Sequence, residues 1–215
     1  MMKCVVVFSG GPDSACVAYW AKDRGYDVYT ITFDYGQIAK VEIERARRIA
    51  LELGVTHKVV DLSSLEEIYS GVTSLVDTGI QMTREFSDPI VVPFRNGVFL
   101  AVTVAYAASI GADTILYGAQ GSDEENYPDC RREFYKAFEE AARLGTETPI
   151  VIDAPFSGLT KAEMLRRGVE FGVPFHLTWS CYRNGPLHCG ACESCNNRRR
   201  AFQEAGVHDP TEYEA

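Results

Sequence analysis

The sequence predicts an α/β fold, a doubly wound and mostly parallel sheet of about five strands with helices on both faces. Two observations lead to this expectation. Short β-branched and aromatic runs alternate along the chain with longer segments of helical periodicity, as in successive βαβ units. The first of these runs also leads directly into a glycine-rich loop and then a helix, an arrangement in which such folds bind phosphate groups.

Each element follows from the residues that compose it. The runs rich in valine, isoleucine and aromatic residues predict strands over 3–8, 27–33, 56–61, 114–117 and 150–153. Helices are predicted over 13–25, 40–53, 97–110, 131–144 and 161–171. Apolar residues at helical spacing indicate the second, an almost wholly apolar and therefore buried run indicates the third, and Thr160 is the expected N-cap of the last. Residues 65–93 have no clean period, and we expect them to cross the carboxyl edge of the sheet, where such folds bind ligands.

Composition limits the possible classes of protein. A chain of 215 residues with 46% hydrophobic residues can bury a sizeable core. No apolar run is long enough to span a membrane and the N-terminus lacks a long apolar region, so we expect a cytoplasmic protein. The net charge of −9 argues against a nucleic-acid partner, and the arginine clusters at 45–48 and 198–200 are interpreted as solvated helix faces. A small-molecule substrate is therefore expected.

The glycine-rich loop covers residues 8–14, with the sequence F-S-G-G-P-D-S. Its glycines let the backbone approach a ligand, and the hydroxyls of Ser9 and Ser14 can hold an anion together with the free amides of the helix start. The loop lacks the Gly-Lys-Ser/Thr ending of the Walker loop. The pattern S-G-G-x-D-S resembles the pyrophosphate loop of the ATP-pyrophosphatase superfamily, which holds the β and γ phosphates of ATP while an acid attacks the α phosphorus.

Four of the seven cysteines gather in one short stretch as C-x7-C-x2-C-x2-C: Cys181, Cys189, Cys192 and Cys195. Four thiolates complete the tetrahedral coordination of zinc at ~2.3 Å per bond and leave no open position. The pattern therefore predicts a closed, structural zinc site, with an iron–sulfur cluster as the alternative. His188 is expected to be a bystander.

Further motifs run in order across nearly the whole chain and resemble the 7-cyano-7-deazaguanine synthase (QueC) family. They are F-D-Y-G-Q at 33–37, V-P-F-R-N at 92–96, Y-P-D-C-R at 127–131 and T-W-S-C-Y at 178–182. The resemblance implies an adenine nucleotide alpha-hydrolase-like fold, with an ATP-binding domain over 1–175 and a zinc-binding segment over 176–215 packed on it.

The resemblance also implies a reaction. ATP activates 7-carboxy-7-deazaguanine as an adenylate, ammonia gives the amide, and a second activation gives the nitrile, a precursor of the modified tRNA bases queuosine and archaeosine. The expected cofactors are ATP, Mg²⁺ and Zn²⁺, the ammonium is free, and the protein is a homodimer.

Residue roles follow from the same resemblance. The residues expected to bind ATP are Phe8, Ser9, Gly10, Gly11, Pro12, Asp13, Ser14, Ala15, Cys16, Val17, Ala18 and Asp34. Those expected in catalysis are Ser9, Asp13, Ser14, Arg95 and Lys161, where Asp13 is a magnesium ligand or fixes the loop and the two cations stabilise charge on the phosphates. The substrate is expected to contact Phe94, Arg95, Asn96, Tyr127, Asp129 and Arg131. Cys130 is expected to be a buried core residue.

The chain departs from the family pattern at three places. Pro12 stands where the family has glutamine, Phe94 replaces the glycine of V-P-G-R-N, and the loop 118–126 differs. A side chain at position 94 is expected to narrow or reshape the substrate pocket, which leaves the exact acid substrate open, including a protein partner for the deazaguanine. Two other functions remain open: a tRNA-thiolating or tRNA-adenylating enzyme of the superfamily, and a zinc-stabilised module that binds ATP without turnover.

Overall fold

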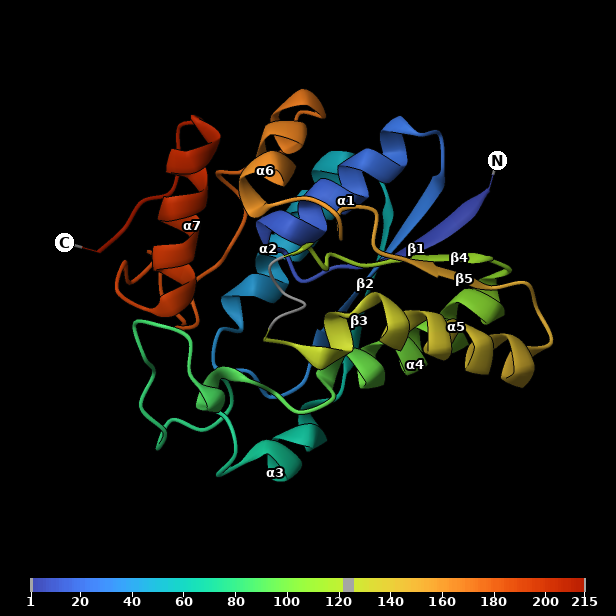
Figure 1. The fold of residues 1–215 in the computed structure, drawn as a ribbon, viewed down its shortest axis with the longest axis horizontal. Helices are drawn as coiled ribbons and strands as arrows, with labels where there is room; N and C mark the ends of the chain where they lie inside the picture. Colours follow the sequence, from blue (N-terminus) through green and yellow to red (C-terminus); the bar gives the residue numbers. More distant parts are fainter. Residues whose placement is uncertain (1, 122–125, 215) are drawn as a thin grey trace.

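Five parallel strands form the centre of the protein within residues 2–121 and 126–214, which the computed structural model describes (Figure 1). Their order across the sheet is β3-β2-β1-β4-β5. The strands are β1 (Lys3–Val7), β2 (Asp27–Asp34), β3 (Thr56–Asp61), β4 (Thr114–Leu116) and β5 (Val151–Asp153). Because β1 pairs with both β2 and β4, the order of the chain reverses between β1 and β4. A crevice for ligands opens at such a point, outside the carboxyl ends of the strands.

Helices cover both faces of this sheet (Figure 1). Alternation along β1 explains why, since Cys4 and Val6 pack in the core formed with α1, α2 and α6, whereas Val5 packs in the core formed with α4 and α5. The helices are α1 (Pro12–Asp23), α2 (Val41–Leu53), α3 (Glu66–Tyr69), α4 (Arg95–Ile110), α5 (Arg132–Thr146), α6 (Lys161–Glu170) and α7 (Glu193–Ala205). The predicted fold class is confirmed.

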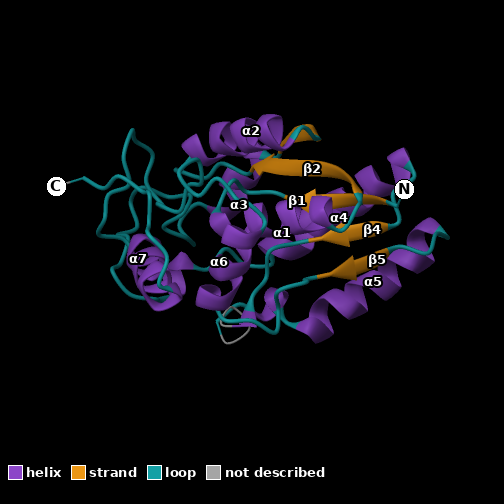
Figure 2. Ribbon diagram, turned by 90° about the horizontal axis from the view of Figure 1, so that it is seen from above, coloured by secondary structure: helices purple, strands orange, loops and turns teal. Residues whose placement is uncertain are grey.

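The segment between α3 and α4 crosses the carboxyl edge of the sheet, as the absence of periodicity predicted. Leu75, Val76 and Val92 form a small core of their own with Tyr35, beyond the end of β2. In Figure 2 the strand arrows point toward these loops and toward α7. Thr83 accepts a hydrogen bond from the backbone of Glu193 at 3.1 Å, so the segment is attached to the start of α7.

The interpretation of both arginine clusters as solvated helix faces is wrong in part. Arg198 is 1% exposed, because it lies on the inner face of α7 and donates hydrogen bonds to Asp209 at 3.0 Å and to the carbonyl of Phe175 at 3.0 Å. Arg45 is half-buried, with its guanidinium 5.6 Å from the ring centre of Trp179. Among the helices of the described residues, none combines the length and the apolar character needed to cross a membrane.

Candidate active site and cysteine cluster

The loop between β1 and α1 is held in shape by its own hydroxyl groups. Ser9 Oγ accepts a hydrogen bond from the amide of Gly11 at 3.2 Å and lies 3.2 Å from Ser14 Oγ. Ser14 Oγ in turn accepts from the amide of Ser9 at 3.2 Å. The N-cap of α1 is Gly11, so no side chain caps the first amides of the helix. An anion can take that place, favoured by the positive end of the helix dipole.

Gly10 fixes the loop against the rest of the protein. Its φ of +82° favours glycine, and a Cβ at this position would lie 2.5 Å from the carbonyl oxygen of Glu42 and 2.8 Å from the amide of Ala46. On the other side, the amide of Trp179 donates to the Gly10 carbonyl at 2.9 Å. The loop is therefore pressed between α2 and the segment that leads to the cysteines.

Asp13 and Lys161 form an ion pair within the site. Lys161 Nζ lies 3.1 Å from Asp13 Oδ2 and reaches it from the first residue of α6. The other carboxylate oxygen, Oδ1, is buried and has no hydrogen-bond partner among the described residues. A buried acceptor without a partner costs free energy, and a carboxylate oxygen is a ligand that Mg²⁺ prefers. The residues present therefore fit a magnesium ion beside the loop.

A cavity of about 1060 Å³ opens beside this loop. Its wall brings together the residues predicted from distant parts of the sequence. Those predicted site residues that line it are Phe8, Ser9, Gly11, Pro12, Asp13, Ser14, Arg95, Asn96, Tyr127 and Lys161. Cys130 also lines the cavity and is 8% exposed, as predicted for a buried residue. A volume of this size accommodates a nucleotide together with a second small molecule.

Other predicted residues lie outside the lining of this cavity. Gly10 is behind the loop, Arg131 directly precedes α5, and the α1 residues Ala15, Cys16, Val17 and Ala18 belong to the core. Asp34 accepts from the amide of Gly36 at 3.1 Å and pairs with Lys40 at 3.3 Å. Asp129 accepts from the backbone amide of Asn96 at 2.9 Å, so it satisfies a free amide at the start of α4. Within the departing loop 118–126, residues 122–125 lie outside the described residues.

Phe94 is also placed outside the cavity lining. It precedes α4 with a φ of +56°, is 59% exposed, and packs edge-on against Phe134 at a centroid distance of 5.7 Å. The left-handed backbone turns its ring toward α5, and the cavity is lined instead by the next two residues, Arg95 and Asn96. A left-handed position favours glycine, which agrees with the glycine of the motif that this segment resembles.

Several residues that line the cavity were not predicted as site residues from the sequence. Glu42 and Gln37 lie in the wall near the end of β2, and Tyr35 beside them accepts a hydrogen bond from Arg95 Nη1 at 3.2 Å. Burial raises the pKa of Glu42 to about 7, although the Gln37 hydrogen bond and the Arg95 charge act in the opposite direction. The F-D-Y-G-Q motif could have identified Gln37 as a site residue from the sequence. No sequence pattern indicates Glu42, which only the folded structure places in the cavity wall.

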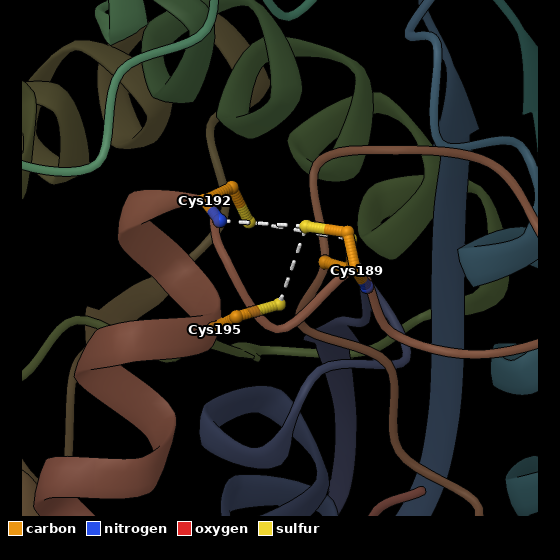
Figure 3. Close-up of side chains that lie close together, drawn as sticks. Cys189, Cys192 and Cys195 are labelled. Atoms are coloured by element: carbon orange, nitrogen blue, oxygen red, sulfur yellow. Dashed lines mark hydrogen bonds between the residues drawn. The ribbon is translucent and has the colours of Figure 1, made fainter. Parts of the chain in front are cut away.

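The four predicted cysteines converge on one point. Their sulfur atoms all lie within 4.8 Å of one another, with 4.0 Å between Cys189 and Cys195 and 4.0 Å between Cys181 and Cys192. Figure 3 shows three of them pointing toward each other, Cys195 from the first turn of α7. Sulfurs around a tetrahedral ion with ~2.3 Å bonds are ~3.8 Å apart, so the cluster can hold a metal ion with little movement.

Backbone amides support the charged form of these sulfurs. The amides of Arg183 and Cys189 each lie 3.4 Å from the Cys181 sulfur, and those of Ala191 and Cys192 lie 3.5 and 3.4 Å from the Cys189 sulfur. Hydrogen bonds of this kind favour a thiolate, the form that binds metals.

His188 stands beside the cluster as a bystander, as predicted. Its Nε2 accepts a hydrogen bond from the amide of Ser180 at 3.0 Å, and its ring packs on Trp179 at 4.1 Å. Nε2 is therefore already engaged with the backbone, and the ring is held by packing.

A parallel sheet of this order, with a glycine-rich loop facing a cavity at the reversal of strand order, defines a nucleotide-binding α/β protein. Residues 3–206 match the family described as queuosine biosynthesis protein QueC, and the chain belongs to this family. The family predicted from the motifs is therefore confirmed.

Curated relatives match over the full length of the chain. A protein of Caldicellulosiruptor bescii named 7-cyano-7-deazaguanine synthase is 41% identical, covering 99% of this chain and 98% of the relative. One of the same name from Methanoculleus marisnigri is 43% identical, covering 100% of both. Among solved structures, the NMN synthetase of Francisella tularensis superposes with a TM-score of 0.56 at 15% identity, covering 95% of this chain and 77% of the other, which supports the fold alone.

Proposed function

We propose that this protein is an ATP-dependent carbon–nitrogen ligase that converts 7-carboxy-7-deazaguanine and ammonia into 7-cyano-7-deazaguanine, a precursor of queuosine and archaeosine. The observation that carries the proposal is the shared wall of the cavity, where the phosphate loop faces Arg95 and Asn96 of the R-N motif. Two relatives that bear the name of this synthase match the chain from end to end, which supports the same assignment.

The chemistry explains why an ATP site and an acid site must adjoin. A free carboxylate repels nucleophiles and has no good leaving group. Attack of its oxygen on the α phosphorus of ATP releases pyrophosphate and makes AMP the leaving group. Ammonia then displaces AMP and gives the amide with loss of one proton. The amide oxygen is adenylated in the same way, and loss of AMP with the remaining nitrogen protons gives the nitrile.

Residues of the loop are suited to the phosphates of ATP. Ser9, Gly11 and Ser14, with the uncapped amides of α1, would hold the β and γ phosphates. Lys161 and Arg95 place two cations on the cavity wall, where they would stabilise charge that develops during phosphoryl transfer. Magnesium bound at Asp13 would neutralise part of the phosphate charge.

The four cysteines would hold zinc as a structural ion, because four thiolates leave no position for a substrate. In this proposal residues 1–175 bind the nucleotide, residues 176–215 form the zinc segment packed against them, and the protein acts as a homodimer in the cytoplasm. Metal analysis tests the ion, since zinc gives one atom per chain without visible absorption, whereas an iron–sulfur cluster colours the protein.

One incubation tests the function. The protein is mixed with ATP, Mg²⁺, ammonium and 7-carboxy-7-deazaguanine, and the products are read by mass spectrometry. We expect the nitrile, with AMP and pyrophosphate formed in step with it. A matched reaction with Ser9→Ala protein, which lacks one loop hydroxyl, should release far less pyrophosphate.

The other functions predict other products. Activity that requires tRNA and a sulfur donor would assign the protein to tRNA thiolation. ATP binding without pyrophosphate release, with this acid or any other, would assign it to the non-catalytic class.

A further inference from the structure

Glu42 lies in the wall of the cavity and has no role in the reaction steps given above. It lies in the first turn of α2, and its backbone carbonyl is packed against Gly10 of the phosphate loop. Its side chain lines the same cavity as Ser9, Asp13 and Arg95. The carboxylate thus shares the cavity in which an adenylated acid would form.

Gln37 fixes the orientation of this carboxylate. Its Nε2 donates to Glu42 Oε1 at 2.9 Å and to the carbonyl of Phe33 at 3.1 Å, and its Oε1 accepts from the amide of Tyr35 at 2.8 Å. Gln37 is 2% exposed and is bound through both ends of its amide, so it is a rigid support. The Gln37 hydrogen bond uses Oε1 of Glu42, and among the described residues no hydrogen bond to Oε2 is found, so Oε2 can accept a proton from a ligand.

The other carboxylates of the cavity wall within the described residues are less suited to this role. Asp13 pairs with Lys161, and Glu193 accepts from Tyr182 at 2.8 Å through one oxygen and from Asn197 through the other. Glu85 and Glu204 are exposed. Because Asp13 Oδ1 is the oxygen that would bind magnesium, half-buried Glu42 is the carboxylate of this part of the wall that keeps an oxygen for the reaction.

The reaction needs such an acceptor more than once. Ammonia attacks the acyl adenylate, the new C–N bond forms as the C–O bond to AMP breaks, and one N–H proton must leave. The amide then loses one nitrogen proton when its oxygen is adenylated, and the last when AMP departs and the triple bond forms. Lys161 and Arg95 are cations and cannot accept these protons.

We propose that Glu42 accepts the protons that the substrate nitrogen releases during amination and nitrile formation. The inference rests on the proposed function and adds to it a residue and a role. Gln37 is a positioning residue in this scheme, because it acts through Glu42.

The electrostatic surroundings support this role. Burial raises the pKa of Glu42 to about 7, whereas the Gln37 hydrogen bond and the Arg95 charge lower it and the Asp34 charge raises it. Among the described residues the Tyr35 hydroxyl, whose own pKa is raised by burial, also faces Glu42. A base with a pKa near the working pH transfers protons most effectively. Activity should therefore rise with pH as Glu42 loses its proton near pH 7.

The test separates amination from adenylation. Wild type, Glu42→Gln and Glu42→Asp proteins receive ATP, Mg²⁺ and 7-carboxy-7-deazaguanine, with either ammonium or hydroxylamine. Hydroxylamine is uncharged at neutral pH and traps the acyl adenylate as a hydroxamate. Its nitrogen is far less basic than that of ammonia, so water can take the proton that this C–N bond formation releases. Total ammonium is adjusted so that free ammonia stays constant at each pH. Glu44→Gln is the matched control, because Glu44 is exposed and pairs with Arg47 on the outer face of the same helix.

We expect Glu42→Gln to lower nitrile formation on the order of 10²–10⁴-fold while hydroxamate still forms. The rise of activity with pH near 7 should disappear in Glu42→Gln, and Glu42→Asp should recover part of the rate. Nitrile formation at the wild-type rate, or equal loss of hydroxamate and nitrile, would overturn the inference. If the wild type releases no pyrophosphate with this acid, the proposed function fails and the role of Glu42 fails with it.

Discussion

Gly10 combines a backbone requirement with a packing requirement, and the two can be measured separately. Gly10 and Gly25 have nearly equal φ values of +82° and +80°, but a Cβ at Gly25 meets nothing within 4 Å. Gly25→Ala therefore measures the backbone strain alone. Gly10→Ala should lower the free energy of unfolding by ~1–3 kcal/mol more, because its Cβ collides with the backbone of α2. Chemical denaturation gives both values, and equal losses would contradict the packing argument.

Phe94 offers a second test at the residue scale. Because its ring faces Phe134 and not the cavity, Phe94→Gly should leave the KM for the acid substrate unchanged. Steady-state kinetics of pyrophosphate release provides the measurement, with Asn96→Ala as the comparison variant from the cavity wall. A lower KM in Phe94→Gly would instead show that the ring restricts access to the cavity.

The attachment of α7 depends on Arg198, which reaches three residues in two other segments of the chain. It pairs with Asp209 and donates to Thr178 Oγ1 at 2.8 Å and to the carbonyl of Phe175. Arg198→Met should lower the free energy of unfolding by about 3–5 kcal/mol, because it removes the cationic partner of the half-buried Asp209 carboxylate together with the buried hydrogen bonds to Thr178 and Phe175. Arg48→Met, on the exposed face of α2, should change it by less than about 0.5 kcal/mol.

The same ion pair predicts a pH dependence. Burial alone would raise the pKa of Asp209, but the Arg198 charge and the hydrogen bonds from Tyr213 and Thr211 outweigh it and hold the pKa below its ordinary value. A lowered pKa stabilises the fold above the pKa of the unfolded chain, and this stabilisation is lost as the pH falls through the folded pKa. The difference between wild type and Arg198→Met should stay constant down to about pH 4 and shrink below it.

Elements with local signals were predictable from the sequence, whereas burial set by distant partners was not. The β-branched runs and the capping residue Thr160 gave strands and the start of α6 close to their observed bounds. Arg198 looked like its two arginine neighbours, because the acid and carbonyl that bury it come from other segments. Glu42 shows the same limit, since its position in the cavity depends on the end of β2 and on Gly10.

At the scale of the whole molecule, the cysteine cluster should keep one segment of the cavity wall in its folded conformation. The backbone of Glu193, next to Cys192, binds Thr83, and Asn196 donates to the carbonyl of Arg84 at 3.1 Å. Metal removal by a chelator should therefore lower Tm and also expose residues 83–86 to hydrogen exchange. Cys192→Ser should reproduce both effects, and unchanged exchange in that segment after confirmed metal loss would contradict this coupling.

The motifs identified the parts of the site, and the fold brought them together. Residues from the loop after β1, from α4 and from α6 meet at one cavity because the strand order reverses between β1 and β4. The sequence could not separate lining residues from supporting ones: Asp129 supports the start of α4, and Asp34 binds within its own turn. Such distinctions depend on side-chain directions that spacing along the chain does not encode.

Trp179 contacts both the phosphate loop and the cysteine segment, so its fluorescence can report on each of them. Its amide binds the Gly10 carbonyl, its indole nitrogen donates to the carbonyl of Cys181 at 2.8 Å, and its ring is 2% exposed. The chain has two tryptophans, so Trp20→Phe leaves this ring as the sole indole emitter. Its fluorescence should respond both to ATP at the loop and to metal at the cysteines. The protein thus carries a native probe through which communication between its nucleotide and its metal can be followed without any attached dye.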